Sequence, residues 1–244
     1  MTWIPRRSDP LHRYHRGRIR QKTRGDCFRV ERGIDRMTRM GDRTRLELHG
    51  QHVVLRPLRV DDAELTLGWR QSDRAILLNR GAASVADQAA WIASRPKTEL
   101  NFVIQLRSGR PVGMLSLVNI DEVNGRAEPA RFLIGDPDSV KGLPVALEAL
   151  KLLYELVFDQ LELHRVYGTV VADNRLMVKW HKSLGMKEEG RLRQHYFIAG
   201  RFHDGICIGM MEDEYRTVAL PRMNALIGAA AAGTQIVSRS QGTS

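Results

Sequence analysis

The stretch Asp136–Pro144, DPDSVKGLP, stands where the sequence pattern changes from strand to helix. Before it, Ala130–Gly135 has the length and apolar character of a strand. After it, apolar residues recur at the spacing of one helix face and predict a long amphipathic helix; they are Ala146, Leu150, Leu153 and Val157. The stretch is therefore predicted to be a loop that leads a strand into a helix.

This loop has the features of an anion-binding helix start. The first backbone N–H groups of a helix have no partner inside it and carry a partial positive charge, which suits a phosphate. Lys141 adds a cation, Gly142 allows close approach of the backbone, and Pro144 is tolerated in a first helical turn. Strand-loop-helix units with one glycine are common, so these residues alone indicate a generic anion site.

The other segments predict a mixed α/β sheet. Helical patterns surround Leu65–Trp69, include Gln88–Ala93, and run from a capping Asn174 to Ser183, with Gly185 just past the end. Strand patterns precede, separate and follow these helices, and they cover Val53–Leu58, Asn101–Leu106, Val112–Asn119, His164–Val171, Gly190–Phe197 and Gly205–Met211. This order, with an antiparallel run in the middle, does not fit a doubly wound parallel sheet.

Charge divides the chain into parts. Residues 1–40 hold twelve basic and four acidic residues, so they carry +8 of the total net charge of +10. We expect residues 1–40 to be an Arg-rich disordered extension, 41–218 to be the folded domain, and 219–244 to be a flexible tail. The extension is interpreted either as an arm that binds RNA or a membrane surface, or as a solvated tail or upstream extension before Met37 or Met40.

The cysteine pattern indicates a reducing compartment, and we expect a cytoplasmic protein. Cys27 and Cys207 are far apart and form no metal-binding spacing, and the histidine pairs form no recognisable ligand set, so no metal is predicted. No apolar run approaches the ~20 residues of a membrane span, and no membrane partner is expected. Because the folded part is nearly neutral, nucleic acid is not an expected partner either.

Further motifs place the loop in a family context. LRPL at Leu55–Leu58 is followed by LELHRV at Leu161–Val166, VADN at Val171–Asn174 and LGMKEEGR at Leu184–Arg191. With VKGLP of the loop, this series resembles the GNAT superfamily of acetyl-CoA-dependent N-acetyltransferases. It is most similar to the branch of the ribosomal-protein acetyltransferases RimJ and RimL and the amino-sugar acetyltransferases. The resemblance covers residues 46–216 and implies a mixed, mostly antiparallel sheet with splayed parallel central strands, flanked by helices.

The resemblance implies where acetyl-CoA would lie as co-substrate. Its pantetheine arm would pair with the main chain of the strand before the loop, and Asn174 would contact the same arm. The implied strand contacts are Phe132, Leu133 and Ile134, and the implied pyrophosphate contacts are Val140, Lys141, Gly142, Leu143, Pro144 and Val145. The loop departs from the family pattern, because Ser139 takes its first position and Pro144, which cannot donate a hydrogen bond, takes its last.

Two residues are candidates for the proton transfers that the implied reaction needs. A protonated amine must lose a proton before it attacks a thioester, and Glu128 is the candidate base. Its alternative reading is a solvated carboxylate. His181 stands where the family often has a tyrosine, and it is the candidate acid for the leaving thiolate, or else an exposed helix histidine. A backbone amide near Leu133–Ile134 would polarise the carbonyl.

The acceptor pocket is expected between the first two helices and the last hairpin. Aromatic rings suit a sugar or a peptide stem, and arginines suit phosphates. Trp69 is equally interpreted as a core residue. The predicted acceptor contacts are Trp69, Arg70, Asn79, Arg80 and Tyr196.

Three functions remain open at this point. The first is an N-acetyltransferase for an amino sugar, possibly nucleotide-linked. The second is the same chemistry on a protein N-terminus. The third is a non-catalytic acyl-CoA-binding module, or an RNA-binding protein that uses the basic arm. The expected partner is thus a small-molecule or peptide amine, and the expected state is a monomer or a homodimer.

Overall fold

The computed structural model describes residues 45–78, 81–96 and 98–240, with side chains up to Ala230. The predicted extension over residues 1–40 lies outside this part of the chain, as do Asn79 and Arg80. Within it, no helix is long and apolar enough to cross a membrane.

One sheet organises the described residues. Its eight strands follow the order β1-β2-β3-β4-β5-β6-β8-β7, and every neighbouring pair is antiparallel except β5 and β6. This confirms the predicted mixed, mostly antiparallel sheet. The strands are β1 (Leu48–His49), β2 (Val53–Pro57), β3 (Leu100–Leu106), β4 (Pro111–Asp121), β5 (Arg126–Ile134), β6 (Arg165–Val171), β7 (Lys187–Ile198) and β8 (Arg201–Met211).

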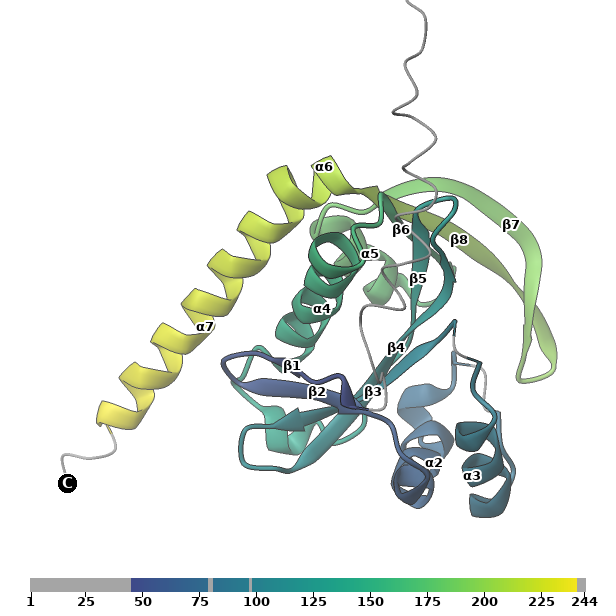
Figure 1. The fold of residues 1–244 in the computed structure, drawn as a ribbon, viewed down its shortest axis with the longest axis horizontal. Coiled ribbons are helices and arrows are strands. Elements are labelled where there is room, and N and C mark those ends of the chain that lie inside the picture. Colours follow the sequence, from purple (N-terminus) through teal and green to yellow (C-terminus); the bar gives the residue numbers. More distant parts are fainter. Residues whose placement is uncertain (1–44, 79–80, 97, 241–244) are drawn as a thin grey trace, which may run out of the picture.

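Helices cover both faces of this sheet (Figure 1). Two short helices, α2 and α3, lie together on one side, while α4 and the long α7 lie on the other. The β7–β8 hairpin extends away from the body. The helices are α2 (Ala63–Gln71), α3 (Val85–Ala93), α4 (Val145–Glu155), α5 (Arg175–Ser183), α6 (Glu212–Glu214) and α7 (Leu220–Ser240), and a π-helical turn over Leu156–Gln160 continues α4.

Alternation along the strands creates two separate cores. Successive residues of a strand point to opposite faces. Phe102 and Leu115 therefore enter the large core beneath α4, whereas Val103 and Met114, their sequence neighbours, enter a small core with Trp69 of α2. The two faces have different surroundings, and each can hold a different part of a site.

Two boundaries differ from those expected. β5 begins at Arg126 instead of Ala130, so Glu128 lies inside the strand. The C-terminal segment expected as a flexible tail contains α7, in which Met223 and Ile227 are buried together with the preceding Ala219. These apolar residues recur every four positions, so one helix face packs against α4, and the alanine-rich sequence favours the helix.

A buried carboxylate fixes α4 to the sheet edge. Glu148 is 5% exposed, and its side chain accepts hydrogen bonds from the backbone N–H groups of Gln51 and His52, the latter at 2.8 Å. These residues form the turn between β1 and β2. Gly50 leaves room for this carboxylate, since a Cβ there would lie 2.7 Å from Glu148 Oε1.

Glu148→Ala should destabilise the fold by about 1–3 kcal/mol, because two partly buried amides would lose their acceptor. Urea unfolding followed by circular dichroism measures this. Glu155→Ala, which removes a partly exposed i,i+4 pair with Lys151 on the same helix, is the control and should cost under about 0.5 kcal/mol. Equal effects of the two variants would contradict the role assigned to Glu148.

Candidate active site

β5 and β6 separate after a short stretch of pairing. Within the described residues, their parallel register holds only for Arg126 with Arg165 and Ala127 with Val166. β5 continues beside β4 to Ile134, and β6 continues beside β8 to Val171. A strand that loses its neighbour leaves backbone groups unpaired along the edge. The two parallel strands thus diverge as the predicted fold requires.

Two features of β5 account for this divergence. Pro129 cannot donate a hydrogen bond to a ladder and is tolerated mainly at edges and bulges. Arg131 has φ +54°, and at this point two residues of β5, Arg131 and Phe132, oppose one residue of β4, Leu115. Such a β-bulge bends the strand that carries it. The bend carries the second half of β5 away from β6.

The open edge of β5 presents specific backbone groups. Leu133 directs its carbonyl toward Gly113 of β4, and the N–H of Gly135 donates to Val112 O at 2.9 Å. Because alternate residues use opposite edges, we infer that the backbone groups of Phe132 and Ile134 face the opening. Leu133 was expected to contact the cofactor, but its backbone faces β4 and its side chain is buried in the small core.

Half-buried apolar side chains surround this opening on the α4 side. The rings of Phe132 and of Trp180 from α5 stack with centroids 5.6 Å apart. Side chains from β6, α5, the loop and α4 also pack against the large core here without being fully buried; they include Val140, Leu143, Leu147, Val170, Ala172 and Val178. An elongated ligand with apolar methylene groups would meet apolar walls on this side.

The loop between β5 and α4 uses some of its amides internally. Leu143 N donates to Val140 O at 3.0 Å, and Ser139 N donates to Asp136 Oδ1 at 3.2 Å. Gly142 has φ +77°, and a Cβ there would meet nothing within 4 Å. By helix geometry, the amides of Val145, Ala146 and Leu147 have no acceptor inside α4. The predicted phosphate contact therefore moves from Val140 and Leu143 onto the first turn of α4.

Acidic residues balance the cation of this loop. Lys141 Nζ lies 2.8 Å from Asp138 Oδ1, and both side chains are exposed, so the pair is weak. Hydrogen bonds from Ser139, together with Arg110, lower the pKa of Asp136. Lys141 thus remains able to exchange Asp138 for a phosphate.

Glu128 stands at the first position of β5 beyond the last residue pair with β6. Its Oε2 accepts a hydrogen bond of 2.8 Å from Asn119 Nδ2. Asn119 lies at a bulge of β4 with φ +51°, which turns its side chain toward Glu128. Across the gap, a Cβ on Gly168 of β6 would lie 3.8 Å from Glu128 Oε1. A small residue at position 168 keeps the space beside the carboxylate open.

Tyr196 reaches the same gap from β7. Its hydroxyl donates to Thr169 O of β6 at 3.0 Å. Burial, and secondly the charge of Glu128, raises the pKa of Tyr196, so the phenol stays protonated. The structure brings this predicted acceptor contact close to the candidate base.

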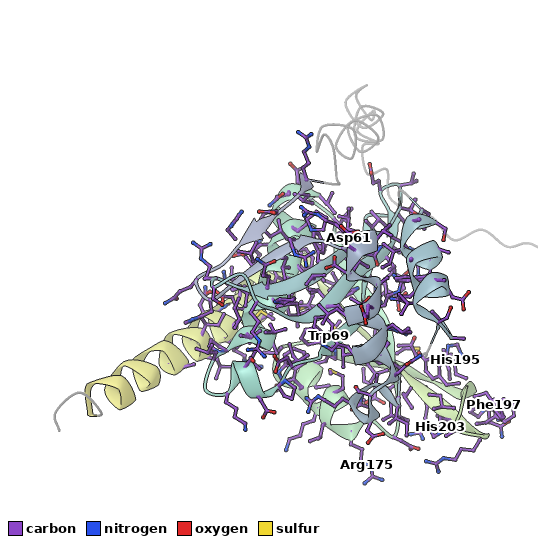
Figure 2. All side chains as sticks on the ribbon, turned by 90° about the horizontal axis from the view of Figure 1, so that it is seen from below. Asp61, Trp69, Arg175, His195, Phe197 and His203 are labelled. Carbon is purple, nitrogen blue, oxygen red and sulfur yellow. The ribbon has the colours of Figure 1, made fainter. Side chains whose placement is uncertain are left out.

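The hairpin that carries Tyr196 is fixed near the body and exposed at its tip. His195, Phe197 and His203 lie along it (Figure 2). His203 is buried, with Nδ1 2.8 Å from Asp173 Oδ2, which ties β8 to the turn before α5. Asn174 caps that helix, since its side chain accepts from Met177 N at 3.2 Å. Its predicted cofactor contact is thus combined with a capping role.

His181 does not have the properties expected of an acid. Its Nδ1 is buried without a hydrogen-bond partner among the described residues. Burial lowers the pKa of His181 to about 4, so the imidazole is neutral at neutral pH. The ring also packs against Trp180 at a centroid distance of 5.2 Å. The predicted donation of a proton from the imidazolium form is therefore corrected.

The predicted acceptor residues on α2 have different environments. Trp69 is 8% exposed in the small core, and its ring occupies the space that a Cβ on Gly135 would fill, so it is a core residue. Arg70 is also 8% exposed, but its guanidinium makes no hydrogen bond or ion pair within the described part of the chain.

A network that the sequence analysis did not predict lies beside Arg70. Arg131 donates to both carboxylate oxygens of Glu99, at 2.9 and 3.3 Å, and to Asn101 at 3.1 Å. The guanidinium groups of Arg131 and Arg95 both lie over the ring of Trp91, at 5.1 and 4.4 Å from its centroid. No local motif signals this network, because it depends on the bulge at Arg131.

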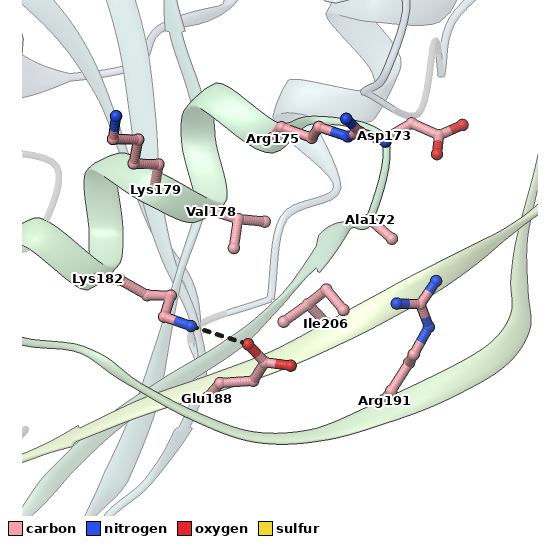
Figure 3. Close-up of a pocket in the computed structure, with 9 residues that line it drawn as sticks. All are labelled: Ala172, Asp173, Arg175, Val178, Lys179, Lys182, Glu188, Arg191 and Ile206. Atoms are coloured by element: carbon pink, nitrogen blue, oxygen red, sulfur yellow. Dashed lines mark hydrogen bonds and ion pairs between the residues drawn. The ribbon is translucent and has the colours of Figure 1, made fainter.

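A pocket of about 470 Å³ lies between α5 and strands β7 and β8, and it shares Ala172 and Val178 with the half-buried apolar residues named above (Figure 3). Lys182 pairs with Glu188 at 3.0 Å, and Arg191 pairs with Asp204 at 2.7 Å. None of the predicted cofactor, catalytic or acceptor residues lines it; its lining is Ala172, Asp173, Arg175, Val178, Lys179, Lys182, Glu188, Arg191 and Ile206.

Comparison with protein families agrees with this geometry. The model of the acetyltransferase (GNAT) domain matches residues 52–187, more than half of the chain. The chain belongs to the GNAT acetyltransferase family. This match includes both central strands, the loop and α5. The sequence-based assignment to GNAT N-acetyltransferases is confirmed.

Individual relatives of this GNAT acetyltransferase are distant. It is 26% identical over 171 residues to the SPbeta prophage-derived uncharacterized N-acetyltransferase YokL of Bacillus subtilis, covering 68% of this chain and 93% of that protein. It is 29% identical over 119 residues to spermidine N(1)-acetyltransferase of Escherichia coli K12, covering 49% of this chain and 62% of that protein.

A solved structure shares the fold. Spermidine N-acetyltransferase from Vibrio cholerae in complex with CoA and spermine superposes with a TM-score of 0.60 at 21% identity. The superposition covers 69% of this chain and 100% of that one.

Replacing His181 should remove part of the acid sensitivity of the GNAT fold. The pKa of His181 is depressed when folded and near 6.5 when unfolded, so the unfolded state binds more protons between about pH 6.5 and 4. His181 therefore makes stability fall as the pH is lowered through this range. Urea unfolding of wild type and His181→Phe from pH 7 to 4 should show a shallower fall for the variant. Identical slopes, or an NMR titration of His181 near pH 6.5, would contradict the burial described here.

Proposed function

We propose that this chain transfers the acetyl group of acetyl-CoA to a primary amine, with Glu128 as the base. The observation that carries the proposal is the position of Glu128 directly beyond the last β5–β6 pair, beside the opening between the strands. Family membership supports the reaction class, and the described geometry supports the choice of residue.

The residues around the opening fit the proposed co-substrate. Phe132 and Ile134 offer main-chain donors and acceptors to the amides of a pantetheine arm, as an added strand would use them. The first turn of α4 offers amides to the pyrophosphate, and Gly142 leaves room for its approach. When bound, acetyl-CoA supplies the activated acetyl thioester. The relative crystallised with CoA shares this fold.

Glu128 can receive the proton that the amine loses. A carboxylate acts as a base when it is ionised and within hydrogen-bond reach of the amine or of one intervening water. Asn119 fixes one carboxylate oxygen, and Oε1 faces the space beside Gly168. Tyr196, whose phenol stays protonated, is positioned on the same side to orient the amine. His181 in its neutral form contributes packing with Trp180.

The acceptor is proposed only as a small-molecule or peptide amine. The Escherichia coli and Vibrio cholerae relatives are named for spermidine, whereas the sequence motifs also resemble enzymes for amino sugars and protein N-termini. Of these, the amino sugar remains the expectation of the sequence motifs. A shared fold does not fix the acceptor, which is chosen by side chains around the site.

Glu128→Gln should lower kcat about 10²–10⁴-fold, since the amide cannot take up the proton, while the Kd for coenzyme A stays within a factor of two. Thiol release from acetyl-CoA with a panel of amines measures kcat, and calorimetry measures Kd. Glu64→Gln, an exposed carboxylate on α2, is the matched control and should retain wild-type kcat.

Full activity of Glu128→Gln would reject Glu128 as the base. Absence of thiol release from wild type with every amine, despite coenzyme A binding, would instead support a non-catalytic acyl-CoA-binding module.

A further inference from the structure

Arg70 presents an unusual charge on the α2 side of the sheet. Its residue is 8% exposed, and its guanidinium has no hydrogen bond or ion pair with any other described residue. Burying a charge without a partner is costly, so almost all buried arginines are paired. Burial, and secondly the charge of Arg131, lowers the pKa of Arg70. Arg70 is thus a largely buried cation without a carboxylate partner among the described residues.

Neighbouring positive charges make the binding of an anion near Arg70 more favourable. Among the described residues of this cluster, Arg95 and Arg131 share the single carboxylate of Glu99, at 3.8 and 2.9 Å, while Arg70 adds a third cation. The Arg70 guanidinium also lies beside the backbone of Gly81. A Cβ on Gly81 would be 4.0 Å from its Nε and Nη2. Gly81 has φ +71°, so glycine suits this position for its conformation as well.

Strand register places this cluster on the face that carries Glu128. Glu128 pairs with Val118 of β4, which lies two residues beyond Ser116. The hydroxyl of Ser116 donates to Asn101 at 2.7 Å. Residues two apart on a strand share a face, and cross-strand partners do too. Met114, two residues before Ser116, packs against Trp69 of α2. Glu128, the Arg131 network and the helix carrying Arg70 therefore lie on one side of the sheet (Figure 1).

We propose that Arg70 binds an anionic group of the acceptor, so that the preferred substrate is an amine that also carries a carboxylate or a phosphate. This inference rests on the proposed acetyl transfer. A guanidinium donates two parallel hydrogen bonds to either oxyanion, and a desolvated one does so strongly. The oxyanion would neutralise Arg70, and the amine of the same molecule would face Glu128. A polyamine carries only cations and would be repelled by the three arginines.

Matched acceptor pairs test this preference. Glucosamine and glucosamine 6-phosphate differ by a phosphate, and the dipeptides Ala-Gln and Ala-Glu differ by a carboxylate. For at least one pair, wild type should show about tenfold higher kcat/KM with the anionic member and lower kcat/KM with spermidine. Arg70→Met, which keeps the apolar stem, should reduce the preference for the anionic member to below about twofold. Arg70→Lys should show an intermediate preference, because lysine keeps the positive charge but cannot donate two parallel hydrogen bonds.

A stability measurement tests the anion site without turnover. With coenzyme A saturating its own site, inorganic phosphate should raise the Tm of wild type relative to chloride at equal ionic strength. Arg59→Met, which removes an exposed arginine, should show the same shift, whereas Arg70→Met should show none.

The outcomes separate this inference from the proposed function. If amines are acetylated but Arg70→Met keeps the wild-type preference and the same phosphate shift, Arg70 does not bind an anion and only this inference fails. If no amine is acetylated, the proposed function fails, and the phosphate shift alone decides whether Arg70 is an anion site. A phosphate shift that is absent from wild type, with no anion preference in turnover, also overturns the role of Arg70.

Discussion

β5 is an inner strand at its start and an edge strand at its end. This change depends on Pro129, on the bulge at Arg131, and on the short parallel register with β6. A continuous ladder would use every backbone group of both strands and leave nothing for a ligand. Because the ladder stops after Ala127, the sheet keeps free main-chain groups at its centre while its surroundings remain packed.

The gap that this interruption leaves between β5 and β6 joins the two faces of the sheet. On the α4 face, half-buried apolar residues and the first turn of α4 suit a long ligand with a diphosphate. On the α2 face, Glu128, the Arg131 network and Arg70 suit a polar acceptor. The proposed substrates would approach from opposite faces and meet at the gap. The bulge residues Asn119 and Arg131, both with positive φ, supply the side chains that line the acceptor side.

Sequence patterns predicted the elements well and the site less completely. Alternation and turn residues located every strand from β2 to β8. Capping located α5 through Asn174. Trp69 occupies the core position that was one of its two interpretations from the sequence. The bulges left no such signal, so the network around Arg131 was missed, and the low pKa of His181 does not follow from local sequence. These properties arise from tertiary burial, which one-dimensional patterns do not record.

Residue-specific amide hydrogen exchange, read by NMR with and without coenzyme A, shows whether coenzyme A binds between β5 and β6. Exchange should be slower at Ile134 and across Val145–Leu147 when coenzyme A is bound. The amide of Leu133, which faces β4, should change little and serves as an internal reference. Binding that leaves the exchange of Ile134 and the α4 start unaltered, or no binding at all, would contradict a ligand held between β5 and β6.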